Sequence, residues 1–486
     1  MNEKYLLYLI KNRKIALIFF FVMYLAFTLV PWITIHDSAH DTFIASAGTG
    51  FFMSVALTFM LPVIQFSFVH KRNSADLYFS LPVKRRDQLI TNILFSFLIA
   101  FGYFLVSVLI VYIFMAHFAV GFGLVMSLIL AAALGIMELL IIHSAIYLIA
   151  NNEFDGIVML AAYACIPILV TICAHTFAYQ MIAGISSSSM DFSNISLLSP
   201  VYMIFENVIT LLQGQQMKIS YCIMPVAFTL AACYIAWKNF TERKTERAEQ
   251  LSDQFLAYPF IIHIYAFLIL IVLAASVITD GFKDILIFYL LLTFIYIVAT
   301  FVYRRKIEIN LKYISIYVIS IIASFVLAFA CWSTKGFGIA ENYSVDKTDY
   351  LSVNYNATCR KDDLSKQIIY DNENYLNTVT VGFDIQIPLN DSQYDEVFTM
   401  IDQYRKKGIN EFYQNHDAFG SNSYAMLHFT NTEQSDYVYL NNYNYSLNTF
   451  LTEEELQKIN QFTPVTVYDN DGKEYTLDTF LKKRKD

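Results

Sequence analysis

Two ionisable side chains, Glu138 and His143, stand inside one of the most apolar stretches of this chain. A charged group at the centre of a bilayer costs at least about 2.5 kcal/mol on insertion scales, so both side chains should face protein or water. Together they suggest a transport pathway or a proton relay. The plainer interpretations are a neutral glutamate hydrogen-bonded between helices and a histidine with a satisfied ring.

Two His-Asp pairs, His36-Asp37 and His40-Asp41, lie four residues apart in one polar segment. On a helix this spacing would place both pairs on one face, where zinc or copper could bind. In a loop that is not helical the same residues are ordinary solvated side chains. We therefore expect no metal site here.

The motifs of several enzyme classes are missing from the sequence. G-x-x-x-x-G-K-[ST], G-x-S-x-G, H-E-x-x-H and C-x-x-C do not occur, and Gly472-Lys473 lies in an expected hairpin. We expect a protein that is not an enzyme and that binds no cofactor directly. If it drives active transport, the energy must come from a partner or from an ion gradient.

The composition is that of a membrane protein. Hydrophobic residues make up 56% of the 486 residues, charged residues 15%, and the mean hydropathy is +0.46. The net charge of -8 argues against nucleic acid as a partner. Six cysteines in a chain of this length indicate neither a disulfide framework nor a zinc site.

Nine stretches are long and apolar enough to cross a bilayer, which predicts a polytopic α-helical membrane protein. Every Lys and Arg before residue 336 falls in an inner segment if the N-terminus is inside, except Lys218, Lys283 and Lys335. This distribution predicts a cytoplasmic N-terminus and a C-terminus on the outside. The predicted spans are 14–35, 47–69, 89–115, 123–150, 156–179, 219–237, 257–278, 284–303 and 313–333.

The segment 336–486 has no further apolar span and an excess of acidic residues. Alternation at 378–387 predicts a strand, and the 391–407 pattern followed by Gly408 predicts a helix that ends at this glycine. Further strands are expected at 424–429 and 437–443. Thr452 and Glu455 predict a capping box, and Asp471-Gly472 a turn between 465–468 and 474–477. We expect one extracytoplasmic α+β domain.

The inner loop 71–87 between the second and third spans is the most informative polar segment. Ser74 is expected to cap a short helix, and Pro82 to end it before a basic turn. Its apolar side chains would suit a groove on a soluble partner. The alternative is a basic loop that lies on lipid headgroups.

Two segments carry a resemblance to a known family. Ser-Ala-Asp-Leu-Tyr-Phe-Ser-Leu-Pro-Val-Lys-Arg at 74–85 resembles the LPxxR loop of ABC transporter permeases of the exporter-like second type. Arg-Lys-Thr-Glu-Arg-Ala-Glu at 243–249 is similar to an R-x-x-E-x-A segment of Gram-positive members of that class. Members with an extracytoplasmic C-terminal domain have a comparable layout.

The resemblance implies a division of the chain. The segment 1–13 would be an amphipathic elbow helix, 14–237 a six-span permease core, and 238–256 a cytoplasmic basic loop. Three additional spans (257–335) and the extracytoplasmic domain (336–486) would follow. It also implies that Glu206, in the apolar segment 201–212, belongs to an outer helix near the exit of the pathway, although a simple amphipathic surface segment fits equally well.

The family's coupling helix corresponds to the loop 71–87. The residues implied to contact a separate ABC ATPase subunit are Asp76, Leu77, Tyr78, Leu81, Lys84 and Arg85, with Tyr78 and Leu81 filling its pocket. ATP and Mg²⁺ would be bound by that subunit. A second permease chain, identical or homologous, would complete the transporter in the cell membrane, and export is the implied direction.

Three other classes remain open. A polytopic sensor or scaffold would bind an envelope ligand through its extracytoplasmic domain. An ion-coupled carrier would need buried charge pairs and broken helices in internal repeats, which the sequence does not clearly contain. A membrane enzyme is disfavoured because the sequence offers no nucleophile-base or metal constellation. The substrate cannot be assigned from these patterns.

Overall fold

Nine helices within the described part of the chain are long and apolar enough to cross a membrane, as the sequence predicts. The protein is therefore a polytopic α-helical membrane protein. The computed structural model describes residues 3–34, 38–116, 120–183, 198–216, 219–252, 254–307, 311–339, 350–360, 378–388, 391–414, 425–430, 443–446, 451–469 and 473–485.

The long helices are α1 (Glu3–Thr34), α2 (Ala39–Phe66), α4 (Arg85–Val111), α5 (Phe122–Ile149), α6 (Glu153–Met181), α8 (Ile219–Thr241), α9 (Tyr258–Asp280), α10 (Phe282–Arg304) and α11 (Leu311–Ser333). The short elements between them are η1 (Ser67–His70), α3 (Arg72–Phe79), η2 (Tyr112–Ala116), α7 (Pro200–Leu212) and η4 (Thr245–Arg247).

Two boundaries differ from expectation. The second span was expected to begin at residue 47, but α2 begins at Ala39 because the Ser38 hydroxyl accepts a hydrogen bond from the Asp41 N–H at 3.0 Å and caps the helix. Of the segment 1–13, expected as a separate elbow helix, the described part from Glu3 onward is continuous with the first span in α1.

The chain forms two compact units. The first comprises residues 1–171, 192–265 and 296–309, and the second comprises 172–191, 266–295 and 310–486. Helices α6, α9 and α10 contribute residues to both.

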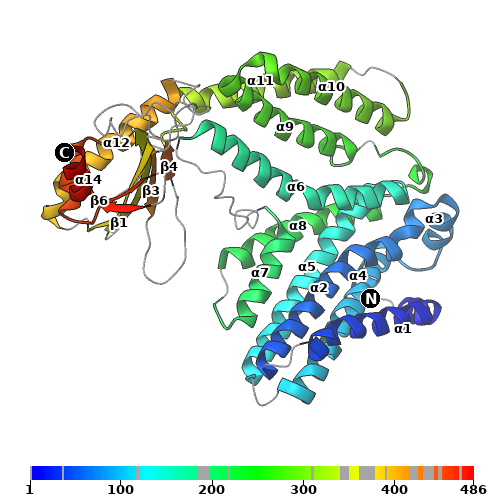
Figure 1. Ribbon diagram of the computed structural model, residues 1–486. Helices are drawn as coiled ribbons and strands as arrows, with labels where there is room; N and C mark the ends of the chain where they lie inside the picture. The colour runs from blue at the N-terminus through cyan, green and yellow to red at the C-terminus, as the bar shows by residue number, and fades with distance from the viewer. Residues whose placement is uncertain are drawn as a thin grey trace. The chain divides into compact units, whose positions relative to one another are not determined.

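In the first unit, α2 packs against α1, α4 and α5, and α5 also packs against α7 and α8 (Figure 1). Small and polar residues allow this close approach. The Tyr24 hydroxyl donates to the Gly50 carbonyl at 2.6 Å and lies 2.8 Å from Ser54 Oγ, which in turn donates to the Ala100 carbonyl. This buried network joins α1, α2 and α4 without leaving a polar group unsatisfied in lipid.

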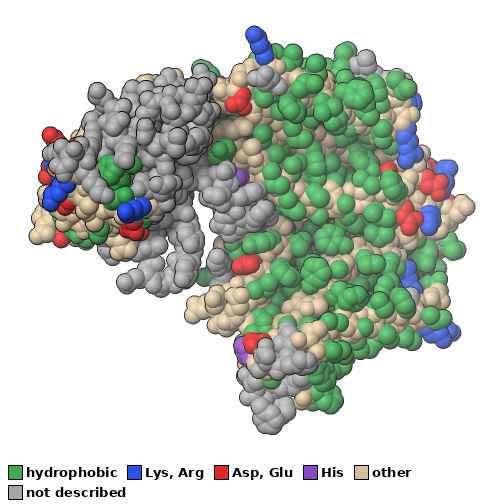
Figure 2. All heavy atoms as spheres, viewed as in Figure 1, with side chains coloured by type: hydrophobic (Ala, Val, Ile, Leu, Met, Phe, Trp, Pro, Cys, Tyr) green, Lys and Arg blue, Asp and Glu red, His purple; other side chains and the backbone are tan. Residues whose placement is uncertain are grey.

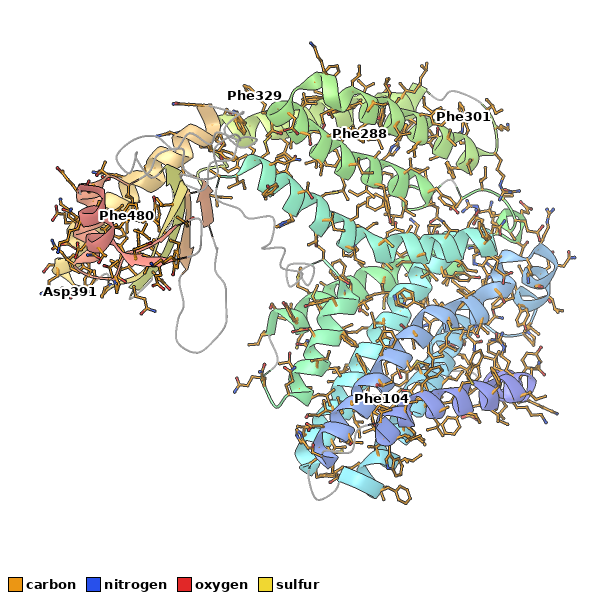
Figure 3. The ribbon with its side chains drawn as sticks, viewed as in Figure 1. Phe104, Phe288, Phe301, Phe329, Asp391 and Phe480 are labelled. Atoms are coloured by element: carbon orange, nitrogen blue, oxygen red, sulfur yellow. The ribbon has the colours of Figure 1, made fainter. Side chains whose placement is uncertain are left out.

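Large side chains divide between the bundle interior and the lipid-facing surface. Phe104 on α4 is fully buried, whereas Phe329 on α11 is 68% exposed and Phe288 on α10 is 53% exposed (Figure 3). Figure 2 shows hydrophobic side chains across the face that covers α1 to α8, with Lys and Arg at the end that carries α3. Such a surface is suited to lipid contact.

The second unit contains an antiparallel sheet with the strand order β4-β3-β1-β2-β5-β6. The strands are β1 (Tyr350–Arg360), β2 (Thr378–Pro388), β3 (Ala425–Thr430), β4 (Tyr443–Ser446), β5 (Thr466–Asp469) and β6 (Glu474–Thr476). The helices α12 (Asp395–Gln414), α13 (Glu453–Asn460) and α14 (Leu477–Lys485) accompany it, with the short helix η7 (Ser392–Tyr394) before α12.

Most of the local patterns in this region are confirmed. The strand predicted at 378–387 is β2, the one at 424–429 is β3, and the Thr452–Glu455 capping box opens α13. The hairpin strands β5 and β6 pair as expected, although 471–472 lies outside the described residues. The strand expected at 437–443 is described only from Tyr443 onward, where β4 begins.

The prediction that Gly408 ends its helix is wrong, because α12 continues to Gln414. Ile409 is 1% exposed in the core of the second unit, and Phe412 packs against Trp332 with ring centroids 5.6 Å apart. These contacts outweigh the cost of about 1 kcal/mol for a glycine within a helix.

The last turn of α12 joins the sheet to membrane helices of the same unit. The Tyr413 hydroxyl donates to the Met181 carbonyl at 3.0 Å and accepts from the Ala183 N–H at 3.3 Å. Gly336 adopts φ +73°, and a Cβ there would lie 3.0 Å from both Ile182 Cγ2 and Tyr413 Oη. A glycine is therefore required where the chain leaves α11.

Candidate functional site

The short helix α3 lies at one end of the first bundle, between η1 and the start of α4 (Figure 1). The sequence predicts a helix in this loop, and the structure confirms one at Arg72–Phe79. Ser74 does not cap it, because Lys71 is the N-cap residue. The Glu249 carboxylate instead accepts a hydrogen bond from the Arg72 N–H at 3.4 Å.

The six residues predicted to contact a partner divide into an outward and an inward group. The outward group is Asp76, Leu77 and Lys84, and the inward group is Tyr78, Leu81 and Arg85. Leu77 is 64% exposed. Tyr78 and Leu81, which are predicted to fill a partner's pocket, are partly buried against the chain's own helices, and their contact with a partner stays a prediction. The exposed apolar residue of α3 is Leu77.

Tyr78 and Phe79 on the inner face of α3 pack against Phe66, Phe68 and Phe240. We call these five aromatic residues the aromatic socket. The Tyr78 ring stacks on Phe68 with centroids 4.3 Å apart, and Phe79 meets Phe240 edge-on at 5.7 Å. Phe66 and Phe240 lie 5.8 Å apart. The socket therefore connects α3 to the end of α2 and to α8.

Arg85, the first residue of α4, attaches this region to the end of α8. Its Nη1 donates to the carbonyls of Thr241 at 3.0 Å and Arg243 at 2.7 Å. Its guanidinium carbon lies 4.3 Å from the centroid of the Phe79 ring. A cation here provides a hydrogen-bond donor for the carbonyls at and just after the C-terminus of α8. It also complements the negative end of the α8 helix dipole.

Arg243 likewise donates hydrogen bonds to main-chain carbonyls at the end of α5. Its Nη1 donates to the Leu148 carbonyl at 3.1 Å and its Nη2 to the Ala150 carbonyl at 2.9 Å, while Nη2 lies 3.5 Å from His70 Nδ1. Burial, and then the neighbouring Arg247, lower the pKa of Arg243 to about 10. The side chain therefore remains a cation at neutral pH.

Other segments meet α3 at the same end of the bundle, which we call the α3 end. Lys71 pairs with Glu153 at the start of α6 at 3.1 Å, and Arg305 lies 3.9 Å from Asp155. The two segments that carry the family resemblance, 74–85 and 243–249, are also brought together here by the contacts of Arg72 and Arg85. Each of these segments was predicted to lie on the inner side.

The first residues of α1 pack beneath α3. Tyr5 is 5% exposed, and its hydroxyl accepts a hydrogen bond from Asn92 Nδ2 at 3.5 Å. Burial raises the pKa of Tyr5 to about 12, and burial together with Tyr8 raises the pKa of Tyr78. Both phenols are neutral at physiological pH and act as hydrogen-bonding aromatic side chains.

The structure does not bring the three candidate pathway residues into one cluster. His143 is 3% exposed, its Nδ1 lies 3.1 Å from Thr58 Oγ1, and its ring stacks on Phe59 at 3.8 Å. Glu138 on α5 and Glu206 on α7 are each partly buried. No hydrogen bond or ion pair within the described residues joins any two of these three side chains. His143 thus fits the interpretation of a satisfied interhelical histidine.

The absence of a metal site at the two His-Asp pairs stays a prediction, because only His40 and Asp41 lie in the described part of the chain. Helix α2 begins only at Ala39, and Asp41 is engaged by the Ser38 cap. His36 and Asp37 lie outside the described residues.

Sequence reasoning missed the residues that hold α3 in place. Phe66 and Phe68 belong to an apolar run predicted as a span, and Phe240 lies in the loop predicted after the sixth span. Gln88, whose Nε2 donates to the Tyr78 carbonyl at 2.8 Å, looks like an ordinary polar residue at a helix start. The available signal was the group of aromatic residues Phe66, Phe68, Tyr78 and Phe79 just before and within the 71–87 loop, since aromatic side chains pair favourably with one another.

Three comparisons with known proteins add no relative: no family model matches the chain, and no curated protein and no solved structure matches it either.

Proposed function

We propose that this protein is the transmembrane permease subunit of an ABC transporter complex in the cell membrane. In this proposal α3 docks on a separate ATPase subunit, which binds ATP and Mg²⁺, and a second permease chain completes the pathway. The N-terminus and α3 lie in the cytoplasm, the C-terminal sheet lies outside, and the direction is export.

The observation that carries the proposal is the two-sided construction of α3. Its outer side presents Leu77, which is 64% exposed, beside the exposed Asp76. Its inner side is packed into the aromatic socket and held by Arg85. A solvated loop on lipid headgroups would not need these packing contacts. A helix that transmits a conformational change from a partner subunit must be rigidly attached to the membrane helices.

The contacts define how movement of α3 would reach the membrane helices. A displacement at Leu77 would pass through Tyr78 and Phe68 to α2, through Phe79 and Phe240 to α8, and through Gln88 to α4. These are packed, hydrogen-bonded groups, so α3 and the three helix ends would move together as one body.

Replacement of Leu77 tests this function. We expect Leu77→Ala to leave the membrane level of the protein unchanged and to lower both the capture of the ATPase subunit and coupled ATP hydrolysis about tenfold, because an apolar anchor at the centre of an interface is lost. The readouts are affinity capture with mass spectrometry and ATP hydrolysis of the reconstituted complex.

Ile307→Ala is the matched control, since Ile307 is an aliphatic side chain of 88% exposure outside α3. It should leave both readouts unchanged. Full ATPase capture and full coupled hydrolysis by Leu77→Ala would refute the docking role of α3.

A sensor or scaffold is the second candidate, and the attachment of α12 to membrane helices favours it. Tyr413 and Trp332 connect the sheet domain to α6 and α11, so a ligand bound by the sheet could change those helices. In this case the tagged full-length chain should capture a kinase and no ATPase with a nucleotide-binding loop.

A further inference from the structure

A cavity of about 500 Å³ lies at the α3 end of the first unit, between the last turns of α8 and the residues Arg247 and Gln254 to Leu256. Its described lining contains no residue of α3, and it includes Arg243, whose carbonyl accepts the hydrogen bond from Arg85. Its volume is in the range of ordinary ligand sites, which is about 300–1,000 Å³. What this cavity binds follows from the membrane character of α8 and not from the proposed transporter function.

The charge of the cavity lining is positive. Lys238, Arg243 and Arg247 line it, and Glu242 is the acidic lining residue within the described part of the chain. Neither Lys238 nor Arg247 forms an ion pair with any described residue. Three converging cations against one carboxylate repel one another, and a bound anion would relieve that repulsion.

Arg243 gives the cavity a buried donor. This side chain is 5% exposed, and its two terminal nitrogens are engaged with the carbonyls of Leu148 and Ala150. Its Nε is buried and has no hydrogen-bond partner among the described residues. A buried cation at the wall of the cavity lies in a low-dielectric setting, where its attraction for an anion is stronger than in bulk water.

The position of the cavity specifies the kind of anion. The apolar span of α8 ends at Thr241, so the three cations lie where hydrocarbon gives way to water. Two aromatic residues of the lining, Tyr234 and Phe255, are 66% and 70% exposed. Cations beside exposed aromatic surface at a membrane boundary are what a phosphate joined to apolar chains requires.

We propose that this cavity binds the phosphate group of an anionic membrane phospholipid. The phosphate lies between Lys238 and Arg247 with Arg243 beneath it, and the acyl chains lie along Tyr234 and Phe255. The lipid thereby neutralises the buried end of α8 and stabilises the attachment of α8 to α5.

Native mass spectrometry of the delipidated full-length protein tests the proposal. We expect phosphatidylglycerol to bind at least tenfold more strongly than phosphatidylcholine, and millimolar inorganic phosphate not to displace it. Lys238→Gln and Arg247→Gln should each weaken phosphatidylglycerol binding about fivefold, and the double variant about 25-fold, because each cation near an anionic headgroup contributes a similar amount. Arg243 stays unchanged in these variants because it holds α5.

Two controls separate a specific site from general attraction to a basic surface. Lys4→Gln with Lys11→Gln removes the same charge from exposed positions on α1 and should leave phosphatidylglycerol binding unchanged. Lys238→Arg with Arg247→Lys keeps the charges and should retain binding, which excludes a folding defect as the cause of the loss.

Equal binding of phosphatidylglycerol and phosphatidylcholine, or unchanged phosphatidylglycerol binding by the double Gln variant, would overturn the proposal. Displacement of the lipid by inorganic phosphate would assign the cavity to a soluble phosphate and would overturn the lipid assignment. None of these results depends on finding an ATPase partner.

Discussion

At the scale of single residues, two arginines connect helix ends at the α3 end through hydrogen bonds to main-chain carbonyls. Arg85 and Arg243 each donate to two main-chain carbonyls at the ends of α8 and α5. A guanidinium can satisfy several acceptors in a fixed plane, which a lysine ammonium on a flexible stem cannot do equally well. The geometry therefore depends on arginine and not only on positive charge.

This difference can be measured with adjacent residues. Arg85→Lys should lower the free energy of unfolding by about 1 kcal/mol, because one of the two charged hydrogen bonds is lost in a partly exposed position. Arg86→Lys is the control: Arg86 is exposed and lies 5.3 Å from the Trp237 ring centroid, so its replacement should have little effect. Thermal unfolding in detergent reports both, and equal midpoints for the two variants would contradict the capping role of Arg85.

At the scale of elements, close helix packing in the first unit depends on a missing side chain. A Cβ on Gly135 of α5 would lie 2.3 Å from Ile204 Cγ2 of α7, a distance that side chains do not tolerate. Small residues at such crossings let membrane helices approach closely. This contact positions α7, the helix that carries Glu206.

Gly135→Ala should therefore destabilise the protein by about 1–3 kcal/mol, the usual cost of overpacking. The double variant with Ile204→Ala should recover most of that loss, because the space taken by the new methyl group is released. Thermal unfolding of the four variants of this cycle in detergent measures the coupling. Additive effects of the two substitutions would mean that α5 and α7 do not meet at this point.

Gly102→Ala offers a control on a neighbouring helix, since a Cβ there meets no atom within 4 Å. This variant should have an unfolding midpoint at or slightly above that of the unchanged protein, because alanine favours helix.

At the scale of the whole molecule, the expected orientation places the N-terminus and α3 inside and the C-terminal sheet outside. Impermeant maleimide should label Lys473→Cys in intact cells and Asp76→Cys only after permeabilisation, in a background without native cysteines. Both positions are exposed, so the contrast reports membrane sidedness. Labelling of Asp76→Cys in intact cells would place α3 on the outside and remove the basis for a cytoplasmic ATPase partner.

Some features were accessible from the sequence because their causes are local or additive. Hydrophobic length predicts the nine spans in the described chain, and the Thr452 capping box needs only residues three apart. The helix between 71 and 87 was also predictable, since its pattern lies within one short segment. The errors concern competition with distant groups: Gly408 does not end α12, because Ile409 and Phe412 are packed in the core and against Trp332.

The sequence by itself determined that this is a multi-span helical membrane protein with a polar, strand-forming C-terminal region, because apolar length and two-residue alternation are properties of contiguous residues. Only the tertiary structure decided which side of α3 is free. Leu77 is aliphatic and its neighbour Tyr78 carries a polar hydroxyl, yet Tyr78 stacks on Phe68 while Leu77 is exposed. That choice depends on groups from α2 and α8, whose proximity to α3 arises only when the helices pack.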